Sequence, residues 1–72
     1  MVNVAKLRGK IVECGISVSK LSETIGVDKA TLYRRFSDNG ESFTVGEIEK
    51  IAAALNLNNE ELHSIFFVQT VV

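Results

Sequence analysis

The chain has 72 residues, a formal net charge of −1 and 46% hydrophobic residues. This length allows one small domain with a modest core, and a lone Cys14 and a lone His63 exclude an internal disulfide and an ordinary zinc site. No stretch approaches the roughly 20 apolar residues that cross a membrane. We therefore expect a soluble, intracellular domain in a reducing compartment.

Charge is distributed unevenly along the chain. Residues 1–37 carry seven Lys or Arg against three Asp or Glu, a net +4, whereas residues 38–72 carry one against six, a net −5. A basic half of this kind is typical of a surface that faces a polyanion. On charge alone, the asymmetry is equally compatible with a domain that only needs to stay soluble.

Three short helices are predicted in the first half. Asn3 is a good N-cap for the first helix, and Gly15 ends it because glycine tolerates the left-handed conformation that closes helices. Ser17 caps a second helix that stops at Gly26, and Asp28 caps a third. The residues at helical spacing that should face inward are Val4, Leu7, Ile11 and Cys14, then Val18, Leu21 and Ile25, then Leu32 and Phe36.

Two further helices follow a loop of composition SDNGES. Thr44 and Glu47 form a capping-box pattern, and Asn58 and Glu61 repeat it. The inward residues of these two helices should be Ile48, Ile51, Ala52 and Leu55, then Leu62, Ile65 and Phe66. We predict an all-α chain of five helices in one domain over residues 1–72, with almost no strand.

Residues 67–72 differ from the rest because they are apolar, β-branched and uncharged. One interpretation is a terminus packed loosely over the core. The other is a contact with a second copy or a partner, by strand pairing or apolar burial, in which Phe67 and Val68 take part.

Residues 18–37 have the pattern of a helix-turn-helix unit, in which two short helices meet at a glycine turn. In this unit the second helix enters the major groove of DNA. Each residue turns 100° about the helix axis. With Leu32 and Phe36 inward, the exposed side should hold Ala30 and Arg34, with Tyr33 and Ser37 to one side and Thr31 to the other. The alternative is a solvated helical face without a partner.

The exposed side suits DNA in several respects. Small residues at the helix start allow close approach to base edges, and Arg34 can pair with guanine or hold phosphate. Lys29 and Arg35 lie at the flanks, where phosphate is the expected contact. Backbone donors at the start of the second helix, with Ser19 and Lys20, could hold another phosphate.

The stretch GISVSKLSETIGVDKATLYRRF, with FTVGEIEKIAAALNLNNEELHSIFF after it, resembles the phage repressor and Cro helix-turn-helix family. It is especially similar to the small Cro-like regulators of temperate phages of Gram-positive bacteria. The resemblance covers residues 4–67 and implies the five-helix lambda-repressor/Cro-like fold, with Gly26 in the turn. It also implies that Leu21, Ile25, Leu32 and Ile51 are buried and that the base-contacting positions are Asp28, Lys29, Ala30, Tyr33, Arg34 and Ser37.

Two residues depart from the family pattern. Ser22 stands where a small alanine is common between the two helices. Arg35 stands where an apolar residue is usual, with Phe36 taking over the docking role. The rotation of the third helix, and the choice between Arg34 and Arg35 as the base reader, are therefore open.

The length and the LRGK start resemble the modulators of repression of lactococcal-type phages, which act partly or wholly by binding the phage's own repressor. The resemblance implies a regulator of the lysis–lysogeny switch that opposes the repressor in the bacterial cytoplasm. A chain of pI about 5.7 is poorly equipped for tight operator binding unless a dimer doubles its basic face. Acidic side chains would attract a repressor's basic helix, and those expected to do so are Glu41, Glu47 and Glu49.

Operator DNA and the repressor are thus both predicted partners, with a pure anti-repressor that does not bind DNA as the alternative. No base lies near a nucleophile in the pattern, and no glycine loop is followed by Lys-Ser or Lys-Thr. We expect neither an enzyme nor a cofactor.

Overall fold

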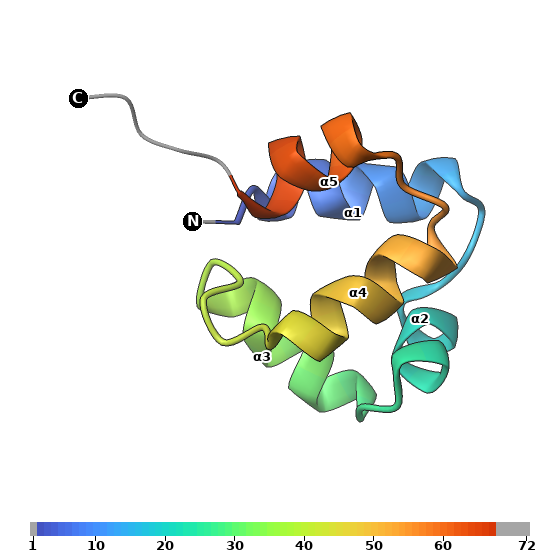
Figure 1. Cartoon of the computed structure of the whole chain (residues 1–72). Coiled ribbons are helices and arrows are strands. Elements are labelled where there is room, and N and C mark those ends of the chain that lie inside the picture. Colours follow the sequence, from blue (N-terminus) through green and yellow to red (C-terminus); the bar gives the residue numbers. More distant parts are fainter. Residues whose placement is uncertain (1, 68–72) are drawn as a thin grey trace.

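A computed structural model describes residues 2–67, which form five helices and no strand. They are α1 (Val4–Glu13), α2 (Val18–Ile25), α3 (Lys29–Ser37), α4 (Val45–Ala54) and α5 (Asn59–Phe66). α1 lies beside α5, while α2 packs against α3 and α4 (Figure 1). The predicted all-α architecture of five helices is confirmed for this part of the chain. None of these helices is long and apolar enough to cross a membrane.

Polar side chains begin four of the helices as the sequence predicts. The side chains of Asn3 and Ser17 accept hydrogen bonds from the backbone N–H groups of Lys6 and Lys20, each at 3.0 Å. Reciprocal capping boxes begin α4 and α5, and their pairs are Thr44 with Glu47 and Asn58 with Glu61. Each cap satisfies a backbone donor that the helix itself leaves free.

The turn between α2 and α3 is made by residues 26–28. Gly26 has a φ of 78°, in the left-handed region, and its N–H bonds to the carbonyl of Ser22 at 2.9 Å. Val27 donates to the same carbonyl at 3.0 Å. A side chain at Gly26 would be strained in this conformation, so the glycine permits the immediate restart that the helix-turn-helix pattern requires.

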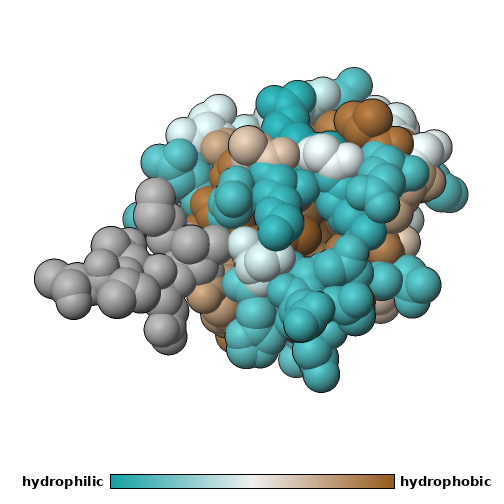
Figure 2. All heavy atoms as spheres, turned by 90° about the horizontal axis from the view of Figure 1, so that it is seen from above, coloured by the Kyte–Doolittle hydropathy of each residue, from teal (hydrophilic) through white to brown (hydrophobic). Residues whose placement is uncertain are grey.

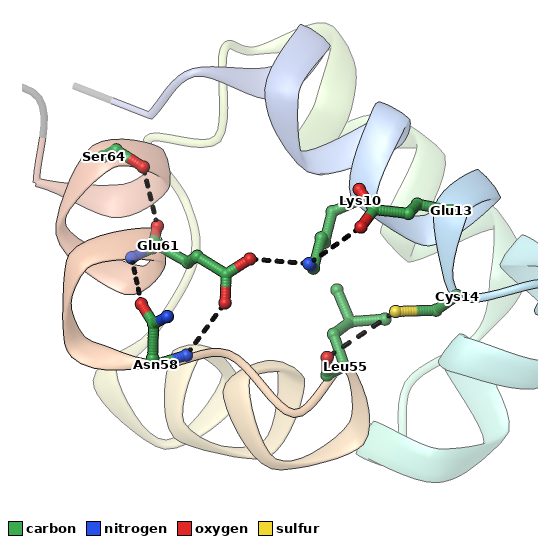
Figure 3. A network of polar contacts seen from close by, with 7 residues as sticks. All are labelled: Lys10, Glu13, Cys14, Leu55, Asn58, Glu61 and Ser64. Carbon is green, nitrogen blue, oxygen red and sulfur yellow. Dashed lines mark hydrogen bonds and ion pairs between the residues drawn. The ribbon is translucent and has the colours of Figure 1, made fainter.

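The core draws on every helix. Five large side chains are at most 1% exposed, one from each helix: Leu7, Leu21, Leu32, Ile51 and Ile65. Cys14 was expected in this core, but the structure leaves it exposed. It lies one residue beyond the last turn of α1, at the rim of the core, where its thiol reaches the carbonyl oxygen of Leu55 at 3.6 Å (Figure 3).

The start of the chain is held against the loop that follows α3. Val2 is 8% exposed, and a Cβ built on Gly40 would lie only 2.6 Å from its Cβ atom. Gly40 also has a φ of 74°. The next residue, Asn3, donates from its backbone to the carbonyl of Ile65 at 2.7 Å. These contacts tie the end of α3, the start of α1 and α5 together.

An ion-pair network joins α1 to α5 (Figure 3). The ammonium of Lys10 donates to Glu61 at 2.6 Å and to Glu13 at 3.3 Å. The Glu61 contact raises the pKa of Lys10, and the Lys10 donor in turn lowers the pKa of Glu61. Seen from the α1–α5 side, hydrophilic residues dominate the surface, and hydrophobic ones form smaller patches between them (Figure 2).

Candidate nucleic-acid interface

α3 turns its apolar side toward the core and a mixed polar side outward. Leu32 and Phe36 are buried, at 0% and 7% exposure. Thr31 and Arg35 are half-buried. The exposed residues of the helix are Lys29, Ala30, Tyr33, Arg34 and Ser37. The structure therefore exposes on one side of α3 five of the seven side chains of this helix that the sequence predicts to contact DNA.

The start of α3 differs from the prediction in one detail. Asp28 occupies the N-cap position with extended backbone, but its side chain accepts no hydrogen bond from the first turn. Its carboxylate is exposed instead. Asp28 therefore leaves an exposed negative charge at the start of α3, and this charge repels phosphate.

Arg34 is exposed and held by a neighbour on its own helix. Its Nη2 atom donates to the Thr31 hydroxyl at 3.3 Å. No carboxylate of residues 2–67 lies within ion-pairing distance of Arg34. The guanidinium therefore keeps free donors for a bidentate contact to a base or a phosphate.

Arg35, the next residue, has a different environment. Its Nη2 atom is 3.0 Å from an oxygen of Glu47, and Nη1 donates to the carbonyl of Ser42 at 3.1 Å. The two charged side chains are only 20% and 14% exposed. The other Glu47 oxygen accepts the backbone N–H of Thr44 at 3.1 Å.

Arg35 and Glu47 thus join α3 to α4. The sequence predicts Arg35 as a DNA contact and Glu47 as an acidic contact for a partner. In the structure the two side chains form an ion pair with each other, and both predicted contacts stay predictions. The reason is geometric: Arg35 lies on the side of α3 that faces α4, and the capping box has already fixed the Glu47 carboxylate there.

Ser22 is a buried polar residue of α2 whose hydroxyl is hydrogen-bonded. The residue is 4% exposed. Its hydroxyl donates to the carbonyl of Ser19, one turn earlier, at 2.7 Å. A buried hydroxyl that is hydrogen-bonded locally carries little penalty, so a serine occupies this position without leaving an unpaired donor.

The start of α2 offers backbone donors to an anion. Ser19 and Lys20 are exposed, and the N–H of Lys20 is taken by the cap of Ser17. Within residues 2–67, the N–H groups of Val18 and Ser19 have no hydrogen-bond partner. This arrangement is suited to a phosphate oxygen.

A cluster of cations and aromatic rings lies on the opposite side of α3 from Arg35. The ring of Tyr33, 40% exposed, has the Lys29 ammonium and the Arg8 guanidinium each 6.0 Å from its centroid. Arg8 lies 5.4 Å from the ring of Phe36 as well. Arg8 comes from α1, and sequence reasoning did not single it out because no local pattern shows which helix will pack beside Tyr33.

The predicted partner contacts that remain belong to segments other than α3. Glu41 and Glu49 are exposed, and Val45, one turn before Glu49, is 73% exposed. Phe67 is 50% exposed with its ring 5.5 Å from that of His63. Val68 lies outside the described residues.

Among residues 2–67, no group of three or more His, Cys, Asp or Glu side chains could hold a metal ion. A family model described as the Cro/C1-type HTH DNA-binding domain matches residues 6–66, from the first turn of α1 to the end of α5. No curated protein and no solved structure matches the chain.

Proposed function

The chain belongs to the family of Cro/C1-type helix-turn-helix DNA-binding domains, and we propose that it regulates transcription by binding operator DNA through α2 and α3. In this proposal α3 lies in the major groove with Ala30 and Arg34 at base edges. Lys29, Tyr33 and Ser37 line the groove beside them.

The observation that carries the proposal is the contrast between the two arginines of α3. Arg34 is exposed and has no ion-pair partner in the described part of the chain, whereas Arg35 forms an ion pair with Glu47. We therefore assign base reading to Arg34. Bidentate pairing with guanine is the contact its fork of donors fits best.

Phosphate contacts come from the start of α2. The free N–H groups of Val18 and Ser19, with the Lys20 ammonium, hold one strand while α3 reads the groove. Because the whole chain is slightly acidic, two copies on a palindromic operator would double the basic surface and the counterion release. The operator complex is thus proposed to contain a homodimer.

The biological role proposed is a phage lysis–lysogeny switch in the cytoplasm of a bacterial host. It rests on the resemblance to Cro-like regulators of temperate phages. In that setting the protein opposes the phage repressor by competing for its operator.

A second route to the same result is direct capture of the repressor. Val45, 73% exposed, and Glu49 lie one turn apart on α4, so they share one face of that helix. This face is exposed, apolar and acidic, and it suits a basic recognition helix. Glu41, exposed in the loop before α4, adds negative charge to the same half of the chain. A pure anti-repressor would bind through this surface, and Arg34 would then make no contact with DNA.

The first experiment selects DNA. A random duplex library of about 20 base pairs, two turns of B-DNA, is enriched on the protein and the recovered duplex is titrated at several salt concentrations. We expect a defined consensus and an association constant that falls steeply with salt. Failure to enrich any sequence, with no salt-sensitive complex at micromolar protein, would exclude operator binding.

The second experiment addresses the repressor. Co-purification of the two proteins should give a stable complex if capture operates, and Glu49→Lys should weaken it. Glu60→Lys, which makes the same charge change at an exposed position on α5, is the matched control. Equal complexes with both variants would count against the acidic surface.

A further inference from the structure

We propose that Arg8 of α1 is a contact for a DNA phosphate, so that the interface has a third anchor outside the helix-turn-helix unit. This inference rests on the proposed function and deepens it. It gives α1 a part in recognition that neither the helix-turn-helix pattern nor the match to the family assigns to it.

The position of Arg8 is the first reason. Around α3, Tyr33 lies between the buried side of the helix and the outward surface that holds Ala30 and Arg34. The Arg8 guanidinium is 6.0 Å from the Tyr33 centroid and 5.4 Å from that of Phe36. It therefore sits at the rim of the outward surface, on the side away from Arg35 and Glu47.

The state of its charge is the second reason. Lys10, two residues later on the same helix, pairs with two carboxylates. Arg8 is exposed and has no ion-pair partner among residues 2–67. Of the three cations of α1, Lys10 is paired, whereas Lys6 and Arg8 have no ion-pair partner among residues 2–67. Arg8 is the one whose charge lies against the rings of α3.

The cation–π contacts of Arg8 with the two rings are the third reason. A guanidinium over aromatic rings is held in place, while its in-plane N–H donors stay available. Lys29 approaches the same Tyr33 ring at 6.0 Å. Arg8 and Lys29 thus place two positive charges beside the outward surface of α3. The phosphates that line the edges of the DNA groove are the groups expected to face these charges.

The test compares three variants on the duplex recovered by selection. Arg8→Met keeps an unbranched apolar stem against the rings and removes the charge. We expect it to weaken binding about tenfold and to lower the slope of log affinity against log salt by about 0.9, the value for one phosphate. Arg8→Lys should keep the slope. Lys50→Met, which removes a charge from α4, is the control. It should change both the affinity and the salt slope less than Arg8→Met does.

A neutral phosphate gives the sharper readout. Duplexes with a single methylphosphonate at each position in turn are titrated with wild type and with Arg8→Met. One position should weaken wild type and leave the variant unaffected, which identifies the phosphate that Arg8 holds. The free energy of unfolding of each variant is measured as well, to separate a loss of affinity from a loss of folded protein.

The outcomes separate this inference from the proposed function. Salt-dependent binding by wild type with an unchanged slope and no coupled phosphate in Arg8→Met would overturn the inference alone. No duplex recovered by wild type would overturn the proposed function and the inference with it. Loss of the repressor complex, but not of DNA binding, on Arg8→Met would assign Arg8 to a protein carboxylate instead and also overturn the inference.

Discussion

The two arginines of α3 are neighbours in the chain and differ in almost every physical respect. Arg34 is exposed, and among residues 2–67 its side chain bonds to the Thr31 hydroxyl alone, while Arg35 is 20% exposed and bonds to Glu47 and Ser42. A rotation of 100° about the helix axis separates the two environments. Residue type and sequence neighbourhood therefore do not decide what an arginine does; the helix that packs beside it does.

The two flanks of α3 differ in the contacts that their cations make. On the α4 side, the charge of Arg35 is met by a carboxylate already held in a capping box. On the α1 side, Arg8 and Lys29 surround Tyr33 and have no carboxylate partner among residues 2–67. The first flank fixes how α3 is seated, and the second leaves positive charge available.

The largest effect is expected from breaking the α4 flank. Glu47→Ala leaves Arg35 half-buried without its carboxylate and opens the capping box, so we expect a loss of about 2–4 kcal/mol of unfolding free energy. Urea unfolding measures it. Glu49→Ala, exposed on the same helix, should stay within about 0.5 kcal/mol of wild type. Equal losses in the two variants would contradict a structural role for the pair.

The next test substitutes each of the two arginines of α3 in turn. Arg34→Ala should cost about 1–3 kcal/mol of binding to the selected duplex and leave unfolding within about 0.5 kcal/mol. Arg35→Met should lower stability and leave the affinity of the folded molecule nearly unchanged. Titration and urea unfolding of both variants are needed. A larger loss of affinity in Arg35→Met would reverse our assignment of the base reader.

Substitutions of Ser22 test whether the position of α3 depends on this buried hydroxyl. Ser22→Ala removes one local hydrogen bond without exposing an unpaired buried group, so stability should change by no more than about 1 kcal/mol. Ser22→Val adds volume at a buried position of α2 and should cost about 1–3 kcal/mol. Thermal and urea unfolding report both changes. A large loss in the alanine variant would show that the hydroxyl positions the recognition helix.

The smallest effect concerns the ion pair that holds α1, the helix that carries Arg8. The lowered pKa of Glu61 means that its contribution is present above its ordinary value of 4.5 and is lost as pH falls through the lowered value. The raised pKa of Lys10 means that its contribution is present below 10.5 and is lost as pH rises through the raised value.

The Tm difference between wild type and Lys10→Met should therefore be small and constant near neutral pH and should shrink at both extremes. Thermal unfolding of both proteins, from below pH 4.5 to above pH 10.5, measures this difference. A difference that grows in acid would mean that the pair is not the cause.

Much of the local structure could be read from the chain. The caps at Asn3, Ser17, Thr44 and Asn58 and the glycine turn at Gly26 all occur where the sequence predicts them. Each depends on bonds within four residues or on the conformational freedom of one residue, so the local order of residue types is sufficient. The outward face of α3 follows in the same way from the 100° rotation per residue.

What the sequence by itself determined, then, is the set of five helices, the side-chain caps of four of them and most of the residues on their apolar sides. The tertiary structure alone decided that Arg35 meets Glu47, that Arg8 lies over Tyr33 and that Cys14 is exposed at the core rim. Pairs 12 and 25 residues apart are brought together by the packing of whole helices, and helix packing depends on the summed shape of many side chains rather than on any short pattern.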